Sequence, residues 1–227
     1  MSGFAPAAGT TPWTAAEAVA AGVPQEDSEL VSQLAARLGL DATKNALEPM
    51  SDPTTLLRFL NARDKDLDKA CTMYTETMAW RGSSGLAKKM NDHGTIPDLY
   101  GADGMQKTDL SSWAWKRATS TPDAALVQRF GFFGRLGRLG PDDEAIIIWR
   151  LGAADLKTTG HHEDKILEAF NAHMEDCMQV GRAASLKHKK LVRSRLVIDL
   201  NGIGLSAIPY LSVIRKILGL GKTESLA

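Results

Sequence analysis

The sequence has few cysteines and no long apolar run. Its 227 residues include two cysteines, Cys71 and Cys177, which are too few for the disulfide framework of a secreted protein, so we expect a reducing, cytoplasmic location. The longest purely apolar run extends from Ala145 to Trp149 and is far shorter than the ~20 residues of a membrane-spanning helix. We therefore expect no segment that crosses a bilayer.

The N-terminal part lacks the features of a secretory signal. No Lys or Arg precedes Arg37, and no Leu or Ile precedes Leu30, whereas a signal peptide needs a basic start followed by an apolar stretch. We interpret residues 1–26 as a flexible lead.

The chain also lacks net charge, because 27 basic residues balance 27 acidic ones. This balance argues against a nucleic-acid partner, whose binding proteins are usually basic. It conceals an asymmetry, since residues 182–227 hold nine basic and two acidic residues, a local charge of +7. An anionic partner is therefore expected for the last fifth of the chain. A hydrophobic content of 44% excludes disorder throughout the chain.

Capping residues and apolar spacing predict helices in the first half. One helix begins near Asp27 and ends at Gly39. A second is marked by Asp52 as N-cap, followed by Pro53. Asp66 is the expected N-cap of a third helix, which ends in the Gly and Ser residues at 82–85. The buried side of this helix is expected to hold Ala70, Met73 or Tyr74, Thr77 and Trp80.

The second half has mixed patterns. Residues 130–133 and 145–150 predict two strands of a hairpin, and residues 162–185 predict a long helix. Residues 195–200 form an apolar run typical of a strand buried on both faces, and Ser206 is the expected cap of a last helix with Ile208, Leu211, Ile214 and Leu218. Residues 94–123 predict no element. The expected fold class is α/β, with an all-helical N-terminal module.

The order of these elements and several of their residues resemble the CRAL-TRIO family of lipid-binding and lipid-transfer proteins. One set of matching residues consists of Asp-Pro-Thr-Thr-Leu-Leu-Arg-Phe-Leu-Asn-Ala-Arg at 52–63, Asp-Leu-Asp-Lys-Ala at 66–70 and Trp-Arg at 80–81. A second set is found at 149–156, 183–188 and 196–205, where Leu-Val-Ile-Asp-Leu-Asn-Gly-Ile-Gly-Leu is similar to the end of the family's third strand. The resemblance covers about residues 50–218, although Lys65 stands where the family usually has Phe.

The resemblance implies a helical module at 27–90 and a lipid-binding domain at 94–227. It also implies that the chain binds and transfers a phospholipid or phosphoinositide-like lipid without being an enzyme and without a cofactor. The family's later strands and lid helix have no counterpart before Ala227, so we expect the domain to be incomplete at its C-terminal end. Ser194 matches a position associated with phosphatidylcholine recognition, but two companion positions hold Leu196 and Ile147, so headgroup specificity is not supported.

Two sets of residues are candidates for contact with lipid or membrane. The apolar strands and the matching serine suggest lipid contact for Ile146, Ile148, Trp149, Ser194, Leu196 and Ile198. For any one of the apolar residues, an ordinary place in the core is an alternative. The basic run suggests contact with anionic headgroups or a membrane surface for Lys187, Lys189, Lys190, Arg193 and Arg195. A solvated helix end with cations near its C-terminal dipole explains this run equally well.

Two other patterns are weaker. Gly202, Gly204 and Ala207 satisfy G-x-G-x-x-A after a strand, but a dinucleotide site also needs a later strand and an acidic residue, so a tight turn explains the glycines better. A metal site among His161, His162, Glu163, His173 and Cys177 lacks a third ligand on the helix face shared by His173 and Cys177. No catalytic signature stands out.

The alternative to a lipid carrier is a module that docks on a membrane or protein without bound lipid.

Overall fold

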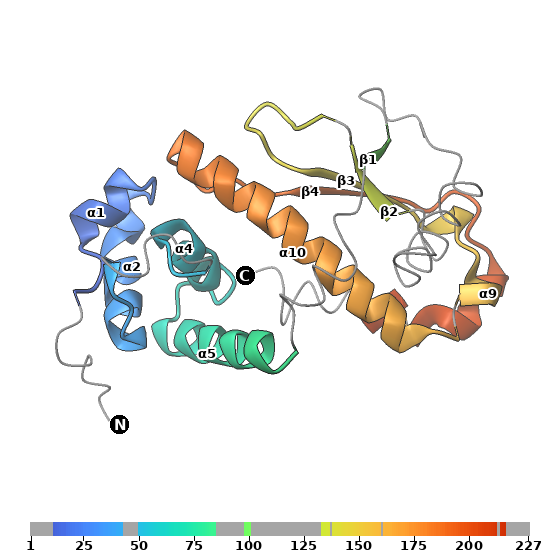
Figure 1. Cartoon of the computed structure of the whole chain (residues 1–227), viewed down its shortest axis with the longest axis horizontal. Helices are drawn as coiled ribbons and strands as arrows, with labels where there is room; N and C mark the ends of the chain where they lie inside the picture. Colours follow the sequence, from blue (N-terminus) through green and yellow to red (C-terminus); the bar gives the residue numbers. More distant parts are fainter. Residues whose placement is uncertain are drawn as a thin grey trace. The chain divides into compact units, whose positions relative to one another are not determined.

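The computed structural model describes residues 11–42, 50–84, 98–100, 133–136, 138–159, 161–212 and 214–216 (Figure 1). The chain is a mixed α/β protein with two compact units. Described residues of the first, the helical unit, lie within 1–84 and 182–192, and those of the second, the sheet unit, lie within 85–181 and 193–225. Among the described residues, no helix combines the length and apolar character needed to span a membrane.

The helical unit begins earlier than expected. Helix α1 (Ala15–Ala20) has a capping box, in which the Glu17 amide donates to Thr14 Oγ1 at 3.2 Å and the Thr14 amide donates to Glu17 Oε2 at 2.8 Å. Helix α2 (Gln25–Leu38) ends at Gly39, which has a left-handed conformation. The expected flexible lead over residues 1–26 is therefore wrong for residues 15–20 and 25–26, which are helical.

Two further helices follow the expected pattern. Helix α4 (Pro53–Asn61) has Asp52 as its N-cap, and helix α5 (Leu67–Ser84) follows Asp66, whose carboxylate accepts from the Lys69 amide at 3.0 Å. The rings of Phe59 and Tyr74 join these helices edge to face with centroids 5.1 Å apart. The core of this unit includes Val31, Leu34, Leu56, Leu57, Phe59, Leu60, Ala70, Met73 and Tyr74.

The sheet unit has four described strands in the order β1 (Asp98–Tyr100), β2 (Phe133–Leu136), β3 (Ile146–Arg150) and β4 (Arg195–Asp199). Strands β2 and β3 pair antiparallel, whereas β1 with β2 and β3 with β4 pair parallel. The antiparallel pairing of the predicted hairpin is confirmed. Strand β2 overlaps the expected first strand, 130–133, at Phe133, and residues 130–132 lie outside the described residues.

The connection from β3 to β4 contains the 3₁₀ helix η1 (Leu151–Ala153), helix α9 (Leu156–Thr159) and the long helix α10 (Glu163–His188). Figure 1 shows α10 running along the sheet. Its apolar side chains pack on those of β3 in one buried core: Ala145, Ile147, Trp149, Leu151, Ile166, Phe170, Met174, Cys177 and Ile214.

Two expectations for the C-terminal part are wrong. Strand β4 is not buried on both faces, because its residues from Arg195 to Ile198 are exposed; it is also the last strand of the described sheet. The last helix is not capped by Ser206: the 3₁₀ helix η2 (Leu205–Tyr210) follows Gly204, and residues 211–212 and 214–216 are α-helical, while residue 213 lies outside the described residues. Pro209 lies inside η2. Leu218 lies outside the described residues.

Candidate functional site

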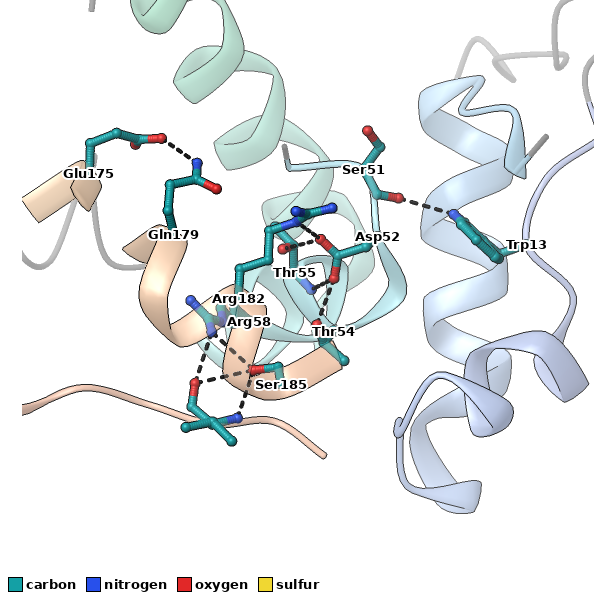
Figure 2. Close-up of polar contacts among 11 residues, drawn as sticks. Trp13, Ser51, Asp52, Thr54, Thr55, Arg58, Glu175, Gln179, Arg182 and Ser185 are labelled. Atoms are coloured by element: carbon teal, nitrogen blue, oxygen red, sulfur yellow. Dashed lines mark hydrogen bonds and ion pairs between the residues drawn. The ribbon is translucent and has the colours of Figure 1, made fainter. Parts of the chain in front are cut away.

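A polar network surrounds the first turn of α4 in the helical unit (Figure 2). Asp52 Oδ1 accepts from the Thr55 amide at 3.0 Å and from Thr54 Oγ1 at 2.6 Å. Asp52 Oδ2 accepts from Thr55 Oγ1 at 2.8 Å and from Arg182 Nε at 2.7 Å. Burial raises the pKa of Asp52, but hydrogen bonds from Thr54, Arg182 and Thr55 outweigh it and hold that pKa below its ordinary value.

A second set of contacts ties α4 to the segment that follows α10. Arg58 donates to the Val192 carbonyl at 2.8 Å and to Ser185 Oγ at 3.4 Å, while the Val192 amide donates to Ser185 Oγ at 2.9 Å. Figure 2 shows these groups converging beside α4. Because the donors and acceptors of this network bind one another, the network stabilises the fold and leaves few polar groups for a ligand.

Helix α10 covers one face of β3, to which Ile147 and Trp149 point. The Trp149 ring lies beside that of Phe170 on α10, with centroids 6.3 Å apart. Side chains alternate along a strand, so Ile146 and Ile148 point to the opposite face, where both are half-buried.

The parallel register decides which predicted lipid contacts share a face. Ile147 is paired with Leu196 and Trp149 with Ile198, so Leu196 and Ile198 point to the same face as Trp149. Ile146 and Ile148 lie on the other face. The structure therefore divides the predicted lipid-contacting strand residues between the two faces of the sheet.

Exposure differs sharply between the two strands. Leu196, Val197 and Ile198 are 43%, 52% and 37% exposed, whereas Trp149 is buried. Ser194 precedes β4 and its hydroxyl donates to the Cys177 carbonyl at 3.5 Å. An exposed apolar strand beside a buried one offers a surface for apolar atoms.

Sequence reasoning missed the exposure of Val197 and of the segment after β4. An apolar run is ordinarily typical of a buried strand, so nothing in the run itself indicated exposure. One signal in the sequence did indicate an unusual surface: residues 200–223 contain no Asp or Glu, unlike an ordinary solvated segment.

The predicted basic residues are exposed, and Arg195 forms an ion pair. Lys187, Lys189 and Lys190 belong to the helical unit and are exposed, as is Arg193 in the sheet unit. Arg195 Nη2 lies 2.8 Å from Oε1 of the buried Glu144. A substitution of Arg195 would therefore lower the stability of the fold as well as weaken any contact with an anionic headgroup.

No protein-family model matches the chain. The chain is 27% identical over 187 residues to the protein named Protein real-time of Anopheles gambiae, a match that covers 80% of the chain and 22% of that protein. The chain thus spans about a fifth of the length of this curated relative.

The histidine-rich start of α10 shows no arrangement suited to a metal. Among the described residues, no three His, Cys, Asp or Glu side chains gather closely enough to hold an ion. The His161 ring lies edge-on to Tyr210 with centroids 6.4 Å apart, and Glu163 pairs with Lys216. The side chain of His173 lies outside the described residues.

In the G-x-G-x-x-A pattern, Gly202 lies in a tight turn against the backbone of Gly152, whereas nothing lies near the Cβ position of Gly204. Gly202 has a φ of +90°, and a Cβ placed on Gly152 would lie 1.7 Å from the Asn201 carbonyl oxygen. The segment that follows is a 3₁₀ helix of six residues, whereas the dinucleotide pattern places its phosphates at the start of an α-helix. The tight turn is therefore the better explanation of these glycines.

Proposed function

We propose that this chain binds a hydrophobic lipid, of the phospholipid or phosphoinositide kind, and transfers it between membranes without catalysing a reaction. The observation that carries the proposal is the exposure of Leu196 and Ile198 on β4, which share one face of the sheet with the buried Trp149 of β3. The residues that resemble the CRAL-TRIO family lie in the same strand and in the helices before it, which supports a CRAL-TRIO lipid-binding domain after a helical module.

The energetics of apolar burial favour such a ligand. Each CH₂ group withdrawn from water contributes about 0.8 kcal/mol, and β4 exposes three consecutive apolar side chains. A bilayer stabilises the same acyl chain by a similar amount per CH₂, so a carrier has only to match it. Apolar walls suffice for this, and no acid, base or metal is needed.

The exposed lysines near the end of α10 support a transient association with anionic membranes. Lys187, Lys189 and Lys190 are exposed, and cations near an acidic leaflet are attracted to it. The protein would then act in the cytoplasm and visit membrane surfaces.

Lipid extraction and native mass spectrometry of the purified full chain test the proposal. A co-purifying lipid at close to one molecule per chain is expected. Ile198→Asp, which places a charge on the exposed strand, should lower the lipid load severalfold. Leu139→Asp is the matched control, because Leu139 is similarly exposed but lies in the β2–β3 connection. A lipid-free protein that still binds vesicles would favour a docking module instead.

A further inference from the structure

The segment that follows β4 exposes an unusual concentration of large apolar side chains. Leu205 is 84% exposed, Ile208 58% and Leu200 57%. Ile203 and Leu211 are exposed in the same stretch. Water-exposed apolar surface gathered in so short a segment marks a place where a protein meets an apolar partner.

The same segment also contributes side chains to the core, so its exposed residues are not misplaced core residues. Ala207 and Ile214 of the same stretch are buried, and Ile214 belongs to the core formed by β3 and α10. The inward side of the segment is thus occupied, while Leu205 and Ile208 point outward. An element that is apolar all round is expected to be covered on its outer side as well.

The turn that presents them is held in place. The Asn201 amide donates to Asp199 Oδ1 at 2.9 Å, and the Ile203 amide donates to the Leu200 carbonyl at 3.0 Å. The close approach of Gly152 to Asn201 holds the turn against η1. The outward side chains are therefore displayed on an ordered support, which reduces the entropy lost on binding.

Basic side chains accompany the apolar stretch and match an anionic partner. Residues 200–223 contain three basic residues and no acidic one. Of these, Arg215 and Lys216 are exposed shortly after the stretch; Lys216 forms an ion pair with Glu163, so the charge argument rests on Arg215. Apolar side chains accompanied by cations match the boundary between acyl chains and anionic headgroups. Two copies of this chain would instead bring like charges together.

We infer that residues 200–211 form a membrane-anchoring segment, which inserts Leu205 and Ile208 into the interfacial layer of an anionic bilayer. The inference rests on the proposed function in one respect, because a lipid carrier has to touch the membrane with which it exchanges lipid. It adds the element that makes this contact, which is distinct from the lysines near the end of α10.

Flotation of the full chain with phosphatidylcholine vesicles, with and without phosphatidylserine, tests the inference. The wild-type chain should bind the phosphatidylserine vesicles more strongly. Leu205→Glu should weaken that binding about tenfold or more, because insertion would bury a charge. Leu139→Glu is the matched control and should bind like wild type. Equal binding by Leu205→Glu and wild type, or no vesicle binding by wild type, would overturn the inference.

A fluorescent label tests insertion directly. A nitrobenzoxadiazole group on Leu205→Cys, in a Cys71→Ser background, should shift its emission to the blue when phosphatidylserine vesicles are added. An unchanged spectrum with bound vesicles would overturn the inference, as would dimerisation without vesicles that Leu205→Glu abolishes. Lipid load is measured separately, so a chain that inserts but carries no lipid refutes the proposed function alone.

Discussion

Arg182 near the end of α10 donates from Nε to Oδ2 of Asp52, the N-cap of α4, at 2.7 Å across 130 residues of sequence. Both side chains are largely buried. The buried Asp52 carboxylate therefore has two roles. It accepts from the Thr55 amide, one of the amides at the start of α4 that have no partner within the helix, and it binds Arg182 from a distant part of the chain.

Asp52→Ala is expected to lower the free energy of unfolding by about 3–5 kcal/mol, because it removes the cap and leaves the buried Arg182 unpaired. Urea unfolding followed by circular dichroism measures the change. Arg182→Met should also destabilise, and the double variant should lose less than the sum of the two single losses. Strict additivity would show that the two groups do not interact.

The stability of the helical unit should fall in acid. The folded-state pKa of Asp52 is held below the ordinary value of 3.8. Its contribution is therefore present above that ordinary value and is lost as the pH falls through the folded pKa. Asp52→Asn should flatten the dependence of unfolding free energy on pH in this acidic range. A profile parallel to that of wild type would contradict the prediction.

Gly152→Ala should destabilise the sheet unit by about 1–3 kcal/mol, because the new Cβ would lie 1.7 Å from the Asn201 carbonyl oxygen. Gly82→Ala is the matched control. Gly82 lies in α5 with nothing near its Cβ position, so alanine there should stabilise by up to about 1 kcal/mol. Thermal unfolding of the two variants should therefore shift in opposite directions.

Trp149→Ala tests whether this residue belongs to the core or to a ligand site. Since Trp149 is buried beside Phe170, the substitution should lower the free energy of unfolding by about 3–5 kcal/mol. Ile148→Ala, on the opposite face and only half-buried, should cost less. A stable Trp149→Ala protein with a reduced lipid load would instead make Trp149 a ligand contact.

The lysines near the end of α10 should govern the salt dependence of membrane binding. Replacing Lys187, Lys189 and Lys190 with Gln should weaken binding to phosphatidylserine vesicles and reduce its sensitivity to salt. Vesicle sedimentation at several salt concentrations measures both effects. If the wild-type chain bound neutral vesicles equally well at every ionic strength, the basic run would have no electrostatic role.

Local signals in the sequence predicted most of the helix ends. Pro53 after Asp52 marked the start of α4, and Gly39 marked the end of α2, because caps and breakers act within a few residues. Helix α1 was missed although its Thr14–Glu17 capping box is visible in the sequence. The candidate site was predicted less well: the strands were identified and alternation allowed only one face of β3 to meet a ligand, but the sequence did not indicate that α10 covers the face of Trp149.

The sequence by itself determined the mixed α/β class, the hairpin of β2 and β3, and the helix ends at Asp52 and Gly39, since each depends on neighbouring residues. Only the tertiary structure decided the bond between Asp52 and Arg182 and the exposure of β4. Burial depends on which elements cover which face, and α10 covers Ile147 and Trp149 of β3 while Val197 and Leu205 remain exposed. The same apolar composition therefore forms a core in one strand and an open surface in the next.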